Sequence, residues 1–208
     1  SSGTDARSLR AIVGGISQSS QGLMALPYVV EEIDAIRRDI AADILLDERF
    51  TTLQLQAKLS QISAPIVHLA THGQFSSKAN DTFLLTWDSR LKIQDFAQLL
   101  RNRQDAFTQP IDLLVLSACQ TATGDKRAAL GLAGVAVRSG TRSVLASLWQ
   151  VNDASTAQLM QIFYHQLTTQ SGVKKSQALR TAQLALLHDD RFRHPFYWAP
   201  FVLVGNWV

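Results

Sequence analysis

The most constraining feature of this sequence is an alternation between short apolar runs and longer stretches with helical periodicity. The runs at 66–71 and 111–117 are almost continuously apolar, not alternately apolar and polar. Strands of this kind are typical of a mostly parallel sheet that helices cover on both faces. The sequence therefore predicts an α/β fold arranged as an α/β/α sandwich.

The expected elements follow one another with short connections. Strands are predicted at 9–14, 42–48, 66–71, 111–117, 143–148 and 201–204, with a small hairpin at 82–87 and 91–93. Helices are predicted at 26–40, 50–62, 93–102, 130–140, 153–169 and 173–187, and a Thr is available to cap the second of them. No internal repeat, low-complexity tract or linker interrupts this order, so we expect a single domain over residues 1–208. The opening SSGT resembles a cut from a longer protein.

Composition narrows the class of protein. The chain is 46% hydrophobic and 18% charged, which is typical of a folded domain. Its net charge of +3 comes from scattered Lys and Arg, so we expect no nucleic-acid partner. The chain contains no signal-peptide pattern and no apolar run long enough to span a bilayer, and we expect no membrane association. The single cysteine cannot form an internal disulfide, which favours a reducing compartment, the cytoplasm.

Two chemically capable residues stand just past two of the predicted strands. His72 follows the 66–71 strand and Cys119 follows the 111–117 strand. Ligands of such folds bind beyond the carboxyl ends of the strands, so both side chains are expected at one edge of the sheet. An imidazole beside a thiol there forms a base–nucleophile pair. Gly73 is expected to let the backbone turn tightly after His72, and its N–H group and that of Cys119 are candidates for stabilising an oxyanion.

Simpler roles explain some of these residues taken singly. A lone cysteine is often inert core packing. His68, in the middle of its strand, is better explained as a core or supporting histidine than as a ligand. His68, His72 and Cys119 are three potential metal ligands, but two histidines four residues apart on a strand lie too far apart for one small ion. We therefore expect no metal and no cofactor.

Longer motifs resemble the CHAT domain, a caspase-like peptidase domain often found beside tetratricopeptide repeats. The resemblance covers most of the chain, in ordered motifs at 68–73 (HLATHG), 114–125 (LVLSACQTATGD), 131–164, 178–187 (ALRTAQLALL) and 194–207 (HPFYWAPFVLVGNW). It implies a caspase-like sheet of about six strands, the last antiparallel. It also implies a cysteine endopeptidase that cuts protein or peptide substrates, with His72 as base, Cys119 as nucleophile and Gly73 with Cys119 as the oxyanion site. A regulatory repeat domain in the parent chain is the expected partner.

The sequence says less about which substrate residue is preferred before the cleaved peptide bond. Ser117, two residues before the cysteine, matches neither the Gln of many caspases nor the Asp of metacaspases. Asp153, after the fifth strand, and Asp125, after the cysteine, are candidates for holding a basic side chain. An N-cap role, shared with Ser155, explains Asp153 equally well. Trp149 fits either a pocket wall or the core.

The loop 122–130 and the activity of the domain each allow more than one interpretation. The polar loop 122–130 carries Lys126 and Arg127 and is either an ordinary loop or a processed, regulatory one. The domain as a whole is either an active endopeptidase or a catalytically silent scaffold in a signalling assembly. A hydrolase or acyl transferase acting on a small molecule is a third hypothesis, and the retained pair His72 and Cys119 favours an enzyme.

Overall fold

Two sheets and a set of flanking helices make up the part of the chain that the computed structural model describes, residues 9–76, 81–117, 120–121, 128–169 and 172–208. The strands are β1 Arg10–Gly15, β2 Ala41–Leu46, β3 Ile66–Ala70, β4 Gly73–Phe75, β5 Phe83–Leu85, β6 Arg90–Lys92, β7 Leu113–Leu116, β8 Gln120–Thr121, β9 Ser143–Ser147 and β10 Phe201–Gly205. The α-helices are α1 Tyr28–Asp39, α2 Thr52–Gln61, α3 Ile93–Ala106, α4 Ala128–Arg138, α5 Asp153–Thr169 and α6 Lys175–His188. Short 3₁₀ turns lie at Asp47–Arg49 and Pro195–Tyr197.

The main sheet has the order β10-β9-β7-β3-β1-β2 within the described residues. All of its neighbouring strands are parallel except β10, which runs antiparallel to β9. This confirms the predicted six-stranded, mostly parallel sheet and its antiparallel last strand. The two strands that carry the candidate dyad, β3 and β7, are direct neighbours at its centre.

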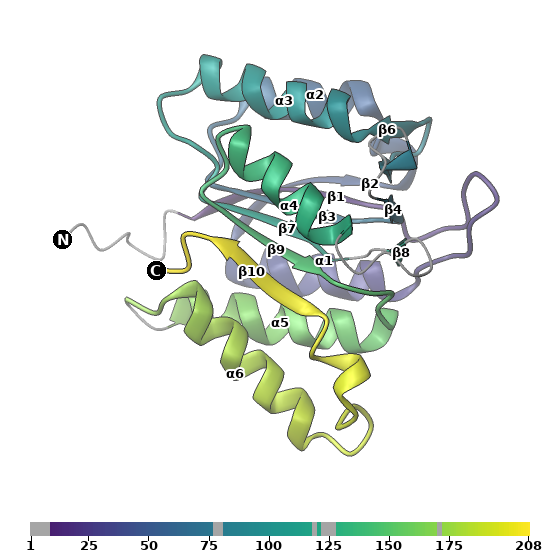
Figure 1. The fold of residues 1–208 in the computed structure, drawn as a ribbon, viewed down its shortest axis with the longest axis vertical. Coiled ribbons are helices and arrows are strands. Elements are labelled where there is room, and N and C mark those ends of the chain that lie inside the picture. Colours follow the sequence, from purple (N-terminus) through teal and green to yellow (C-terminus); the bar gives the residue numbers. More distant parts are fainter. Residues whose placement is uncertain (1–8, 77–80, 118–119, 122–127, 170–171) are drawn as a thin grey trace.

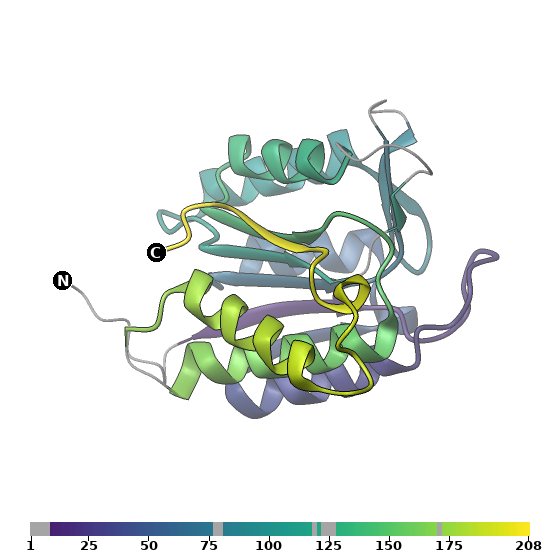
Figure 2. The ribbon, with the colours of Figure 1, turned by 60° about the horizontal axis from the view of Figure 1, so that its bottom comes forward.

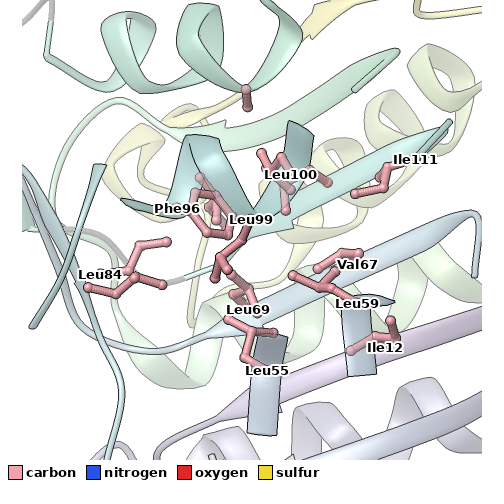
Figure 3. Close-up of a cluster of buried hydrophobic side chains, with 14 of the residues drawn as sticks. Ile12, Leu55, Leu59, Val67, Leu69, Leu84, Phe96, Leu99, Leu100 and Ile111 are labelled. Carbon is pink, nitrogen blue, oxygen red and sulfur yellow. The ribbon is translucent and has the colours of Figure 1, made fainter. Parts of the chain in front are cut away.

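Side chains that alternate along the central strands feed two separate cores. In β7, Leu114 and Leu116 join one core, while Leu113 and Val115 join the other. Helices α2, α3 and α4 cover the first face, and α1, α5 and α6 cover the second, as Figures 1 and 2 show. Figure 3 shows the first core, where the side chains of α2 and α3 meet those of the sheet: Leu55, Leu59, Phe96, Leu99, Leu100, Ile12, Val67 and Leu69.

The predicted helices are present, with local features that explain where they begin and end. Pro27 precedes the first turn of α1. Thr51 caps α2, as predicted, because its Oγ1 accepts a hydrogen bond of 3.1 Å from Gln54 N. Gly140 follows α4 with a φ of 94°, a conformation that favours glycine. No helix in the described ranges combines the length and the apolar character needed to cross a bilayer.

The second sheet, with the order β6-β5-β4-β8, was only half predicted. Its hairpin β5–β6 agrees with the expected hairpin at 82–93. Strands β4 and β8 have two or three residues each, too few to show a periodicity. They matter because β4 directly follows His72 and β8 directly follows Cys119.

The packing of Phe96 in the first core predicts how much stability the domain loses when this side chain is truncated. Its side chain is fully buried, so Phe96→Ala leaves a cavity and should lower the free energy of unfolding by about 3–5 kcal/mol. Chemical denaturation followed by circular dichroism measures the change. Leu53→Ala is the matched control because that side chain is 71% exposed, and its effect should stay within about 0.5 kcal/mol. Equal effects of the two variants would contradict the assigned core.

Candidate active site

The carboxyl ends of β3 and β7 lie side by side in parallel register. Ile66 pairs with Leu113 and Leu69 with Leu116, and Ser117 N donates a hydrogen bond of 3.1 Å to Leu69 O. His72 and Ser117 therefore follow neighbouring strands at the same edge of the sheet, the edge at which the sequence predicted His72 and Cys119. Both line one cavity there.

Cys119 itself lies outside the described residues, but the backbone on both sides of it is described. Ser117 follows β7, and Gln120 begins β8. Strand β8 pairs in parallel with β4, so that Gln120 is opposite Gln74, two residues after His72. The main sheet and the small sheet thus hold the segments before and after Cys119 against the segment that carries His72.

The imidazole of His72 has a defined orientation. Its Nε2 lies 2.8 Å from the carbonyl oxygen of Met24, and the side chain is only 9% exposed. A carbonyl oxygen only accepts, so Nε2 must carry the hydrogen. In the neutral ring, Nδ1 is then the nitrogen that is free to take a proton. Sequence reasoning missed this contact, because a backbone carbonyl has no residue-specific pattern.

The loop that supplies the Met24 carbonyl is anchored by Asp47. This buried carboxylate accepts hydrogen bonds from Ser17 N at 2.7 Å, Ser17 Oγ at 2.8 Å and Gln18 N at 3.2 Å. Further along the loop, Gln21 Nε2 donates to Thr86 O at 2.9 Å. The loop 16–27 is therefore bonded to Asp47, just after β2, and to Thr86, just after β5.

Gly73 has a packing role that differs from the tight turn expected of it. It begins strand β4 and is not among the residues with positive φ. A Cβ added there would lie 3.0 Å from the Phe75 ring and 3.2 Å from Leu84. Close approach of these two side chains, not backbone conformation, thus explains the glycine.

His68 is a buried supporting residue, as expected. Its ring is 0% exposed and points toward α1 and α5. Nδ1 lies 3.0 Å from Tyr164 Oη, and Nε2 lies 2.9 Å from Glu32 Oε1. The second contact is close enough for charge attraction but is not aligned as a hydrogen bond. Burial, with the Glu32 charge in addition, raises the pKa of Tyr164 well above its ordinary value.

A cavity of about 80 Å³ opens beside His72. It lies between the loop 16–27, α1, the end of β7 and the start of α5. Its lining residues are apolar on the loop side and include carboxylates and hydroxyls elsewhere: Met24, Ala25, Leu26, Val29, Glu32, His72, Ser117, Gln150, Val151, Asp153 and Thr156. Two of the residues proposed from sequence, Ser117 and Asp153, thus meet at one site.

Asp153 caps a helix, but not the one that was expected. Its Oδ2 accepts a hydrogen bond of 2.9 Å from Tyr28 N, the first residue of α1. The start of α5 is capped by Asn152 instead, whose Oδ1 accepts from Ser155 N at 3.0 Å. The predicted capping of α5 by Asp153 and Ser155 was therefore wrong, because the neighbouring residue occupies that position.

The surroundings of Asp153 oppose its ionisation. Burial raises the pKa of Asp153 above 3.8, and the charges of Glu32 and, more weakly, Glu31 add to the rise. The Tyr28 N–H and the nearby His72 pull in the other direction. The cavity thus brings two carboxyl groups, Asp153 and Glu32, close enough for the charge of one to affect the other.

The remaining predicted residues do not join this cavity in the described part of the chain. Trp149 is partly buried and donates from Nε1 to Phe196 O at 3.3 Å, on the side of the C-terminal segment. Asp125 and most of the loop 122–130 lie outside the described residues. No group of three or more His, Cys, Asp or Glu side chains suited to a metal ion occurs among the described residues.

A comparison with protein-family models decides the family. The model described as the CHAT domain matches residues 2–206 of the chain. The chain belongs to the CHAT-domain family.

Relatives of this CHAT domain are long repeat proteins. Human Tetratricopeptide repeat protein 28 is 26% identical over 87% of this chain, which covers 8% of that protein. The mouse protein of the same name is 25% identical over 87% of this chain, which covers 9% of it. The chain therefore spans less than a tenth of the length of these relatives.

Solved structures show the fold of this CHAT domain. The crystal structure of the Drosophila initiator caspase Dronc superposes with a TM-score of 0.59 at 8% identity, covering 98% of this chain and 81% of that one. Protein GSU0716 from Geobacter sulfurreducens gives a TM-score of 0.51 at 13% identity, covering 95% and 94%. The fold of this CHAT domain is caspase-like.

Removing the Glu32 charge should lower the pKa of Asp153. Glu32→Gln deletes a neighbouring negative charge, so the carboxylate form of Asp153 becomes easier to populate. A titration followed by carboxyl carbon NMR measures the change. Asp34→Asn on the same helix is the control, since Asp34 does not contribute to the shift and is bonded to Arg37 at the surface. An unchanged Asp153 titration in a folded Glu32→Gln domain would contradict this electrostatic coupling.

Proposed function

We propose that this CHAT domain is a cysteine endopeptidase with Cys119 as nucleophile and His72 as general base. The observation that carries the proposal is the pairing of β4 with β8. It holds Gln120, the residue after Cys119, opposite Gln74, two residues after His72. Ser117, two residues before Cys119, is also held, at the end of β7, by its hydrogen bond to Leu69 O. These two neighbours of Cys119 support the proposal that its thiol works together with the imidazole of His72.

The orientation of His72 suits the proton transfers of peptide hydrolysis. Nδ1 takes the proton of the Cys119 thiol, while Nε2–H stays bonded to the Met24 carbonyl and keeps the ring in place. The thiolate attacks the carbonyl carbon of the peptide bond, and N–H groups of Gly73 and Cys119 stabilise the oxyanion. Collapse of the intermediate expels the amine, which takes the proton from Nδ1. Water then hydrolyses the acyl-enzyme in the same way.

Charge in the cavity supports a preference for a basic residue before the cut. Asp153 and Glu32 both line it, and the charge of Glu32 adds to the effect of burial in raising the pKa of Asp153. A cationic side chain of the substrate would balance the negative charge of these carboxylates. Asp125 is a further candidate for this role, on sequence grounds alone.

The likeness to tetratricopeptide repeat proteins supports regulation by repeats in a longer parent chain. In this proposal the repeats control when the CHAT domain acts on its protein substrate. A free cysteine suits this activity in a reducing compartment such as the cytoplasm. Processing of the loop 122–130 would be one means of control, and intact-mass analysis of the active protein tests for it.

An electrophilic peptide probe tests the dyad directly. Because Cys119 is the single cysteine, labelling at a thiol reports this residue alone. We expect labelling by a probe with a basic leading residue, none in Cys119→Ala, and a rate about 10²-fold lower or more in His72→Ala. Mass spectrometry of the purified domain measures the labelled fraction over time.

His165→Ala is the matched control, since this histidine is exposed and bonded to Asp39 away from the cavity. It should label at the native rate. A thiol that resists both the probe and iodoacetamide in the domain and in the full-length protein would reject the peptidase in favour of a silent scaffold. Equal labelling of native, His72→Ala and His165→Ala proteins would reject His72 as the base.

A further inference from the structure

Two hydroxyl groups in the cavity beside His72 have no hydrogen-bond partner in the described structure. Ser117 Oγ and Thr156 Oγ1 are buried, and neither has a hydrogen-bond partner among the described residues. Both residues line the cavity. Burying a hydroxyl without a partner costs free energy, and a ligand that supplies hydrogen-bonding groups removes this cost.

The charge of the cavity indicates what kind of ligand would fit. Asp153 and Glu32 contribute carboxylates, and the described lining contains neither Lys nor Arg. Glu32 lies against His68, whereas Asp153 Oδ2 is engaged by the backbone N–H of Tyr28. Asp153 Oδ1 has no hydrogen-bond partner in the described structure. The cavity therefore offers acceptor atoms and carboxyl groups, and no Lys or Arg of the described lining pairs with them.

We infer that this cavity receives a lysine side chain of the substrate and selects it over arginine, through Asp153 Oδ1, Ser117 Oγ and Thr156 Oγ1. This inference rests on the proposed function, whose basic preference it narrows to one residue type. The apolar residues of the lining, among them Leu26, Val29 and Val151, suit the unbranched carbon chain of lysine.

The number and kind of the open acceptors distinguish the two basic residues. An ammonium group has three hydrogens that single acceptor atoms can take up, and the cavity lining carries such atoms on Asp153, Ser117 and Thr156. Glu32 Oε1 also lacks a hydrogen bond, but it lies 2.9 Å from His68 Nε2. A guanidinium carries five N–H donors in a plane and is best bound by both oxygens of one carboxylate. Asp153 cannot offer that pair freely, since Oδ2 already accepts from Tyr28 N at 2.9 Å. In a cavity of about 80 Å³, some donors of an arginine would stay unpaired.

Peptide substrates that differ in one residue test whether the cavity selects lysine over arginine. Peptides that differ only in carrying Lys, Arg or norleucine before the cut are compared by kcat/KM with the native protein. We expect Lys to exceed Arg by about tenfold or more, and norleucine to fall below Lys, since norleucine keeps the carbon chain but lacks the charge. An Arg value equal to or above that of Lys, or a norleucine value equal to that of Lys, overturns the inference.

Two threonines provide a matched pair of variants. Thr141 Oγ1 is buried and unpartnered in the described structure, like Thr156 Oγ1, but Thr141 does not line the cavity. Thr156→Val and Thr141→Val therefore remove the same kind of group at two places. Thr156→Val should lower the ratio of Lys to Arg kcat/KM by about tenfold, and Thr141→Val should leave it unchanged. The same ratio in both variants overturns the role of Thr156.

A binding measurement separates failure of the inference from failure of the proposed function. Cys119→Ala protein is titrated with Nα-acetyl-lysine N-methylamide and with its arginine counterpart, followed by backbone NMR shifts of cavity residues. Selective binding of the lysine amide, weakened in Asp153→Asn, supports the cavity as a lysine site even if no peptide is cleaved. Absent binding, or stronger binding of the arginine amide, overturns it whatever the activity.

Discussion

The contact of His68 with Glu32 and Tyr164 is the interaction on which the arrangement of the site depends. Strand β3 is buried on both faces, so hydrophobic burial alone does not decide which face points to which helices. His68 favours one of the two, because its polar partners Glu32 and Tyr164 belong to α1 and α5, whereas Val67 and Leu69 pack into the opposite core. The buried histidine thereby fixes the face of β3 and ties it to both helices, at the usual cost of burying polar groups.

The positions of α1 and α5 in turn determine the environment of His72. Helix α1 starts at Tyr28, where Asp153 at the start of α5 accepts its first N–H. The loop before α1 brings the Met24 carbonyl to His72 Nε2, and Asp47 holds the beginning of that loop. His72, Asp153 and the loop thus belong to one connected structure, in which a shift of α1 would alter all three. The geometry of the candidate site depends on helix packing as much as on the sheet edge.

Periodicity in the sequence was enough to predict the longer strands and helices. It was not enough for features that depend on contacts between distant segments of the chain. The continuous apolar runs predicted the parallel sheet, and His72 lies just past β3, as expected, while the position of Cys119 beside it stays a prediction. Strands β4 and β8 are too short for a pattern, although they hold the segments around His72 and Cys119 together. Glu32 and Thr156 looked like ordinary helix residues because their neighbours in the cavity are far away in sequence. The cap at Asp153 was assigned to the wrong helix for the same reason: a side chain in a helix's first turn usually serves its own helix.

Unpartnered polar atoms alone do not identify a binding site in this fold. Thr141 and Ser147 also bury hydroxyls without partners in the described structure, and neither lines the cavity. What distinguishes Ser117 and Thr156 is that the same cavity contains a carboxylate of raised pKa and the oriented His72. Arg103, buried on α3, donates to Ala64 O and Gln109 O but leaves its Nε without a partner, and it too lies away from the cavity. Beside His72, by contrast, two such hydroxyls share one cavity with the partly buried carboxylate of Asp153, where a ligand can compensate the cost of burying them.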